Sequence, residues 1–173
     1  MIATTRLYWM LGGLAVIGVA AGLSGIVLPV WLGLALVLLV GLAADFWQLR
    51  RASVPGVERS APDSFALGVW TEVSVALTSR SPRDWTVELF DKPPSHAQLE
   101  GLPRREELPA GKQLEVTYRM KATERGKHAF EEADLRVTGP LGLLSRQLGV
   151  GPAEETFRVY PNFKAVARYA LMA

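Results

Sequence analysis

The spacing of apolar residues divides the chain into two parts. Residues 7–44 include no charged residue, and Arg6 and Asp45 flank this run. A membrane-spanning helix needs about 20 mainly apolar residues, so the run is long enough for two spans and a short turn. The pattern therefore predicts two transmembrane helices, at about residues 7–23 and 27–47, which form a hairpin within a first domain of residues 1–51.

Glycine and proline mark the expected turn between the two helices. The stretch GLSGIVLP, residues 22–29, holds two glycines, a serine and a proline, which disfavour a continuous helix. Gly18 and Gly22 form a pair of small residues four positions apart, a spacing that lets two membrane helices approach closely. We therefore expect helix–helix packing at Gly18 and Gly22.

Positive charge indicates how the hairpin is oriented. Arg6 precedes it, Arg50 and Arg51 follow it, and the turn carries none. Positive residues remain on the cytoplasmic side, so we expect both termini in the cytoplasm of a cell with the hairpin in its inner (plasma) membrane. A cleaved signal peptide over residues 1–21 is an alternative, and it also leaves the later residues inside. Asp45 is interpreted as a headgroup-level carboxylate near Arg50 or Arg51.

After the hairpin, apolar and polar residues alternate, which is typical of half-buried strands. About seven strands over some 110 residues match an immunoglobulin-like antiparallel β-sandwich, so the predicted fold class is mainly β, with residues 52–161 as the sandwich domain. The expected strands lie near residue 57 and at residues 72–78, 85–91, 104–107, 114–121, 127–137 and 156–160.

Two local features of this region carry specific expectations. Residues 52–64 are polar and contain proline, so we expect a linker that includes a short first strand. The apolar parity changes between residues 127–130 and 135–137, and a β-bulge at 131–133 would reconcile the two.

The last segment, residues 162–173, has the spacing of an amphipathic helix. Apolar residues recur at i, i+3, i+4, i+7 and i+8, which predicts one apolar face that needs a surface to pack on. We expect this short helix to lead into a further domain. The residues of the face are Phe163, Val166, Ala167, Ala170 and Leu171.

Composition argues against most chemical functions. The net charge is +2, and basic and acidic residues are interleaved, which does not favour nucleic acid as a partner. The chain has no cysteine, so disulfides and thiolate sites are excluded. His96 and His128 lack ligand partners at metal-binding spacing, and no phosphate loop, HExxH or GxSxG motif occurs. We therefore predict no catalytic, metal-binding or cofactor-binding residue, no small-molecule substrate, and no enzyme activity.

Three segments after the hairpin carry a resemblance to a known family. They are VSVALTSRSPRDWTVELFDKPP, LPAGKQLEVTYRMKATERGKHAFEEADLRVTGPLGL and RVYPNFKAVARYAL. Their order resembles the N-terminal region of the bacterial family named domain of unknown function 58. The family's loop usually begins with an acid followed by PLGL, and glycine stands at that position here. The loop residues are Gly139, Pro140, Leu141, Gly142 and Leu143.

The resemblance implies a von Willebrand factor A-like domain after the terminal helix and a MoxR-type AAA+ ATPase as partner. The resemblance assigns no metal-binding or catalytic residue to this chain. The functional hypothesis is a non-enzymatic scaffold, anchored in the lipid bilayer, which positions that domain in complex assembly or envelope stress. The alternative is an extracytoplasmic ligand-binding or hydrolytic sandwich with inverted topology. A transporter or channel subunit is disfavoured because the spans offer few polar residues.

Overall fold

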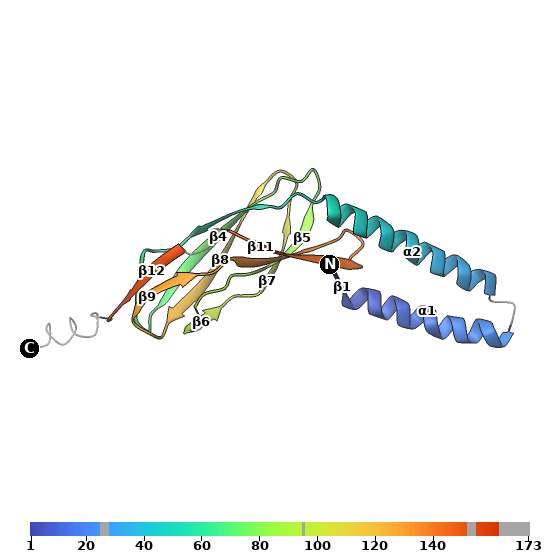
Figure 1. Ribbon diagram of the computed structural model, residues 1–173, viewed down its shortest axis with the longest axis horizontal. Helices are drawn as coiled ribbons and strands as arrows, with labels where there is room; N and C mark the ends of the chain where they lie inside the picture. The colour runs from blue at the N-terminus through green and yellow to red at the C-terminus, as the bar shows by residue number, and fades with distance from the viewer. Residues whose placement is uncertain (25–27, 95, 152–154, 163–173) are drawn as a thin grey trace, which may run out of the picture.

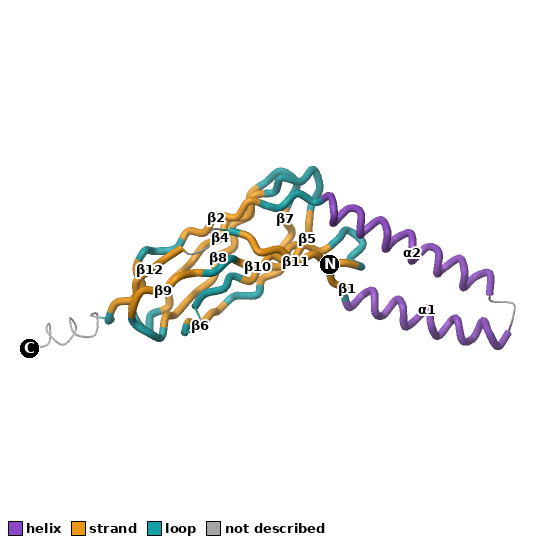
Figure 2. The backbone as a smooth tube through the Cα atoms, viewed as in Figure 1, coloured by secondary structure: helices purple, strands orange, loops and turns teal. Residues whose placement is uncertain are grey.

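A computed structural model describes residues 1–24, 28–94, 96–151 and 155–162. Two helices project side by side from one end of a β-sandwich (Figure 1). In Figure 2 the helices and strands occupy separate ends of the molecule, and the N-terminus lies where they meet. The predicted fold class, mainly β with two apolar helices at the start, is confirmed. The expected terminal helix lies outside the described residues.

The hairpin consists of α1 (Thr5–Ser24) and α2 (Leu28–Arg51). Their mean hydropathies are 1.5 and 2.1, and both are long enough to cross a membrane. In the most apolar 18-residue stretch of each helix, only 11% of α1 and 6% of α2 is buried inside the protein. A core helix of a soluble domain would be mostly covered. Pro29 lies in the first turn of α2, where its missing N–H leaves no intrahelical hydrogen bond unmade.

The strands form three sheets in which all neighbours are antiparallel except the parallel pair β3–β12. The five-stranded sheet has the order β1 (Ile2–Ala3), β11 (Leu144–Val150), β10 (Ala133–Thr138), β5 (Trp85–Phe90) and β7 (Arg104–Leu108). The four-stranded sheet has the order β2 (Gly56–Ser60), β4 (Trp70–Thr78), β8 (Gln113–Ala122) and β6 (Ala97–Glu100). The three-stranded sheet has the order β3 (Ser64–Ala66), β12 (Glu155–Tyr160) and β9 (Gly126–Phe130).

Alternation along the strands produces the core. Every second residue is buried in β5 and β10, in β4 from Val73 and in β8 from Val116, because successive side chains of a strand point to opposite faces of the sheet. These apolar side chains interleave between the sheets, and the last turn of α2 adds one more, Leu49, which is 0% exposed. The core therefore includes a residue of the helical hairpin.

The parity change expected to be a bulge has a different origin. β9 ends at Phe130 and pairs with β12, whereas β10 begins at Ala133 and pairs with β5 and β11. The chain crosses from one sheet to another between these residues, so its inward-facing parity is reset. The bulge prediction at residues 131–133 was wrong, because a change of parity fits a change of sheet equally well.

The strand count and the linker also differ from expectation. Twelve strands are found among the described residues, and β1, β3, β6 and β11 were not predicted. Within residues 52–64, β2 (Gly56–Ser60) is the short first strand that was expected, and β3, which was not expected, starts at Ser64. Only residues 52–55 separate α2 from the first strand that comes after it.

Candidate functional site: the junction of hairpin and sandwich

The carboxylate of Asp45, near the end of α2, holds the loop between β10 and β11. Its side chain is 0% exposed. The backbone N–H groups of Leu141, Leu143 and Leu144 donate hydrogen bonds to its two oxygens at 3.1, 2.9 and 3.0 Å. Hydrogen bonds to a charged acceptor are stronger than neutral ones, so this carboxylate is the principal polar contact between hairpin and sandwich.

The periodicity of α2 explains why Asp45 reaches the loop. Gly41, Asp45 and Leu49 are spaced by four residues and therefore share one face of the helix. At Gly41 the absent side chain leaves room for the loop, and a Cβ there would lie 3.5 Å from Leu141 and 3.6 Å from Leu143. One face of α2 thus contacts the loop at Gly41 and Asp45 and packs in the sandwich core at Leu49.

Gly139 allows the carboxylate to come this close. A Cβ on Gly139 would lie 2.5 Å from Cγ and 2.6 Å from Oδ2 of Asp45, well inside van der Waals contact. The carboxylate that satisfies this loop comes from the helix. Asp45 is not paired with Arg50 or Arg51, as was expected, because its carboxylate accepts hydrogen bonds from the loop.

The other helix is attached to the same loop through the N-terminal segment. β1 pairs with the start of β11, with Ile2 opposite Ser145. The backbone N–H of Thr4 donates to the carbonyl of Leu143 at 3.0 Å, and the Thr4 hydroxyl donates to the carbonyl of Gly142. Since α1 begins at Thr5, both helices enter the sandwich at one loop.

Two side-chain contacts reinforce the end of α2. The Arg146 guanidinium donates to the carbonyl of Leu49 at 3.4 Å, and Arg83 donates to the side-chain oxygen of Gln48. The guanidinium of Arg51 lies over the Trp47 ring, 4.0 Å from its centroid. The helix end is thus held on several sides, and its orientation relative to the sheets is determined by the fold.

The structure brings some of the sequence-predicted residues together and separates others. Arg6 lies in the first turn of α1 and Arg50 and Arg51 in the last turn of α2, all at the sandwich end of the hairpin.

A Cβ on Gly18 would lie 2.8 Å from Nε1 of Trp31, whereas one on Gly22 would meet nothing within 4 Å. Among the described residues, close helix contact is thus made at Gly18 and not at Gly22. The loop residues 139–143 form the junction itself. The positions expected to form the terminal helix lie outside the described residues: Phe163, Val166, Ala167, Ala170 and Leu171.

A buried ionic network inside the sandwich was missed at the sequence level. Arg59 on β2 forms a two-pronged ion pair with Asp91, at 2.9 Å from Nε and 2.5 Å from Nη2. The Tyr118 hydroxyl donates to Asp91 at 2.6 Å. The side chains of Arg59 and Asp91 are 2% and 0% exposed. Arg59 also donates to the carbonyl of Glu131 and to Glu155, so the network ties β2, β8 and β12 together.

The electrostatics of this network favour one protonation state. Burial raises the pKa of the Tyr118 phenol, and the adjacent negative charge of Asp91 raises it further. Burial by itself lowers the pKa of Arg59, but the hydrogen bond and charge of Asp91 outweigh it and leave the pKa raised. Tyr118 is therefore neutral and Arg59 charged at neutral pH. Such a network specifies one packing of the sheets and offers no group poised for proton transfer.

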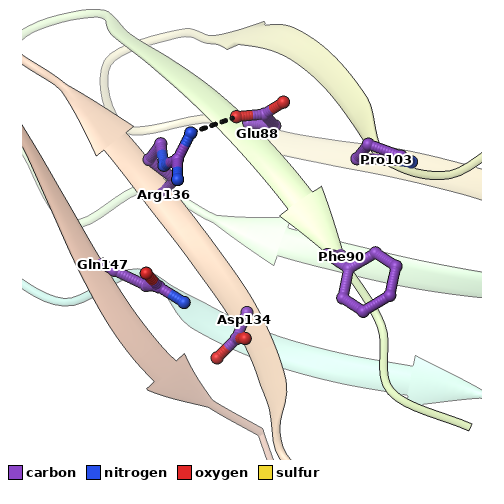
Figure 3. Close-up of a pocket in the computed structure, with 6 residues that line it drawn as sticks. All are labelled: Glu88, Phe90, Pro103, Asp134, Arg136 and Gln147. Carbon is purple, nitrogen blue, oxygen red and sulfur yellow. Dashed lines mark hydrogen bonds and ion pairs between the residues drawn. The ribbon is translucent and has the colours of Figure 1, made fainter. Parts of the chain in front are cut away.

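A shallow groove with mixed polar and apolar lining lies on the outer face of the five-stranded sheet. At one place Phe90, which is 40% exposed, lies beside Asp134 on the neighbouring strand, and Arg136 pairs with Glu88 at 3.4 Å (Figure 3). The groove continues toward the junction, where Arg6 and Arg105 line it. Among the described residues no group of three or more histidine, cysteine, aspartate or glutamate side chains could hold a metal ion.

Comparison with known proteins adds little to this description. No protein-family model and no curated protein matches the chain. Part of α2-macroglobulin from Salmonella is similar to 64% of this chain, at 18% identity and a TM-score of 0.45, and the match covers 7% of that protein. The cupredoxin domain of amoB from Nitrosocaldus yellowstonii (17% identity, 52% of this chain, 55% of that one) has a TM-score of 0.38. A CARDB domain from Pyrococcus furiosus (15% identity, 64% and 90%) has a TM-score of 0.37. Likeness at this level carries no argument about function.

Proposed function

We propose that the chain is a non-enzymatic scaffold whose hairpin crosses the inner membrane twice and whose sandwich stands on the cytoplasmic face in one orientation. The Asp45 junction carries this proposal. Both helices meet the sandwich at one hydrogen-bonded loop, and Leu49 packs in its core. A domain tethered by a flexible linker would need none of these contacts. A rigid junction suits a protein that holds another domain at a defined distance from a membrane.

The surface of the hairpin supports membrane insertion. Large apolar side chains cover it, with Val16 and Val37 each 71% exposed and Leu39 62% exposed. An apolar surface of this extent is unfavourable in water and favourable in lipid. Arg6, Arg50 and Arg51 lie together at the sandwich end, which supports a cytoplasmic sandwich by the positive-inside rule.

The direction of β12 supports a role in positioning a further domain. This strand ends at Tyr160 at the end of the sandwich opposite the hairpin (Figure 1). Residues after β12 therefore start one sandwich length away from the membrane. The resemblance to the domain of unknown function 58 family suggests a von Willebrand factor A-like domain there, with a MoxR-type AAA+ ATPase acting on it in complex assembly or envelope stress.

The topology can be tested directly because the chain has no cysteine of its own. Arg125→Cys places a thiol at an exposed position of the sandwich, and Leu23→Cys places one beside the hairpin turn. We expect a membrane-impermeant maleimide to label Leu23→Cys in intact spheroplasts and Arg125→Cys only after permeabilisation. Labelling of Arg125→Cys from outside would contradict the cytoplasmic assignment and favour the extracytoplasmic sandwich.

The partner can be tested separately. The chain, reconstituted in nanodiscs together with any residues encoded after Ala173, should retain a MoxR-type ATPase from the same bacterium in a pull-down, and nanodiscs that contain the hairpin alone should not. Equal retention by both would contradict the proposed partnership while leaving the topology result intact.

A further inference from the structure

The outer face of the five-stranded sheet carries a row of alternating charges. Register places Arg136 of β10 opposite Glu88 of β5, and Glu88 opposite Arg105 of β7. Glu88 alternates with the buried Val87 and Leu89, and Arg136 alternates with the buried Leu135 and Val137, so both side chains point away from the core. Glu88 lies between two arginines and forms its ion pair with Arg136. The excess cation in this row is Arg105.

Nearer the hairpin, a second arginine joins the first. Two adjoining cavities of about 240 and 440 Å³ are both lined by Arg6, Arg105, Thr138 and Gly142. The backbone of Gly142 has a positive φ of 69°, and a Cβ there would lie 3.0 Å from Nη1 of Arg6. The absence of a side chain at Gly142 thus leaves space for the Arg6 guanidinium, which lines both cavities. We call these cavities together the arginine cleft.

The charges in the arginine cleft are incompletely balanced. Within the described part of the chain, neither Arg6 nor Arg105 has a carboxylate within 4.0 Å, and Glu107, which lines the larger cavity, likewise has no cationic partner. Glu88, Arg136 and Glu106 also line these cavities, but Glu88 pairs with Arg136 at 3.4 Å and Glu106 pairs with Arg104 at 2.7 Å. Two cations and one anion without an ion-pair partner, Arg6, Arg105 and Glu107, therefore face the same polar space, an arrangement that suits a ligand with a phosphate and an ammonium group.

The position of the cleft identifies the source of such a ligand. Arg6 is the second residue of α1, whose apolar span runs from Thr5 to Leu23. If α1 crosses a bilayer, as the proposed function requires, Arg6 lies at the level of the lipid headgroups. We propose that the arginine cleft binds one phospholipid headgroup. Its phosphodiester lies between Arg6 and Arg105, and its primary ammonium, as in phosphatidylethanolamine, faces Glu107.

The experiment uses the full chain in detergent and measures lipid retention by native mass spectrometry. Phosphatidylethanolamine, phosphatidylglycerol and phosphatidylcholine are offered singly at equal concentration. We expect the wild type to retain one phosphatidylethanolamine most strongly. Arg6→Gln and Arg105→Gln should each reduce retention of all three lipids by about tenfold, equivalent to about 1.4 kcal/mol. Glu107→Gln should remove the preference for phosphatidylethanolamine and leave phosphatidylglycerol retention unchanged.

The matched control is Arg119→Gln, an exposed arginine on the four-stranded sheet that pairs with Glu100. It removes the same charge far from the cleft and should leave retention unaltered. An equal loss in Arg119→Gln, or wild-type retention in both Arg6→Gln and Arg105→Gln, would overturn the site. An unchanged lipid preference in Glu107→Gln would overturn the ammonium contact. Because binding is measured in detergent, failure here is distinct from failure of the topology test.

Discussion

The carboxylate of Asp45 occupies the space that the first side-chain atom of residue 139 would need. A Cβ on Gly139 would lie 2.5 Å from Cγ of Asp45. The two residues form a matched pair, since the missing side chain at one allows the carboxylate of the other to accept three backbone N–H groups of the loop. The hairpin and the sandwich meet through this pair.

Gly139→Ala tests the pair. The new methyl group cannot coexist with the carboxylate, so we expect the free energy of unfolding in detergent to fall by about 1–3 kcal/mol, the usual range for overpacking. Gly56→Ala is the control, because a Cβ there meets nothing closer than 3.6 Å. Combined with Asp45→Ala, Gly139→Ala should cost much less than it does alone. Strictly additive effects would show that the two residues do not interact.

The sequence could not reveal this junction because its partners are distant along the chain. Asp45 ends an apolar run, and a carboxylate at that position is ordinarily explained by nearby headgroups or arginines. Its hydrogen-bond acceptor role depends on a loop 96 residues further on. The one available signal was the glycine at residue 139, where the resembled family has an acid.

Prediction of the sheets succeeded where one face of a strand is buried and the other exposed. β4 and β8 alternate regularly and lie next to each other, so period two identified both. β11 was missed because LSRQLGV contains a glycine and has polar residues on both parities. β1 has only two residues and is a strand solely because β11 lies beside it. Neither short nor irregular strands are specified by local pattern.

The buried ion pair of the sandwich should be expensive to break. Arg59→Met leaves the carboxylate of Asp91 buried without its cation, and removal of one partner of such a pair costs about 3–5 kcal/mol. Denaturant unfolding of the full chain measures the loss. Arg119→Met, which removes an arginine that is half exposed and paired with Glu100, should cost less than about 1 kcal/mol. Similar losses in the two variants would argue against a structural role for the network.

Tyr118 should give the sandwich a specific sensitivity to high pH. Because the pKa of its phenol is raised in the folded state, only the unfolded chain ionises near the ordinary pKa of about 10. The stabilisation is thus complete below pH 10 and is lost as pH rises above it. Stability measured from pH 8 to 11.5 should decline more steeply in the wild type than in Tyr118→Phe. Parallel curves for the two proteins would refute the shift.

The hairpin itself should respond to one of its two candidate glycines. The indole N–H of Trp31 donates to the carbonyl of Leu14 at 2.8 Å, and Gly18 provides the space for this ring. Gly18→Ala should displace the ring, break this bond and lower the melting temperature in detergent. The methyl group of Gly22→Ala meets no described neighbour within 4 Å. This variant should leave the melting temperature unchanged or slightly higher, because alanine favours helix. A larger loss at Gly22 would place the helix contact elsewhere.

The rigidity of the junction is measured most directly by electron-electron distance spectroscopy between two spin labels. Val37→Cys on α2 and Arg125→Cys on the sandwich are exposed positions in a chain that has no other cysteine. In nanodiscs the labelled protein should show one narrow distance distribution, and the same pair with Asp45→Ala should show a broad one. A broad distribution in the protein that retains Asp45 would contradict a sandwich held in one orientation on the membrane.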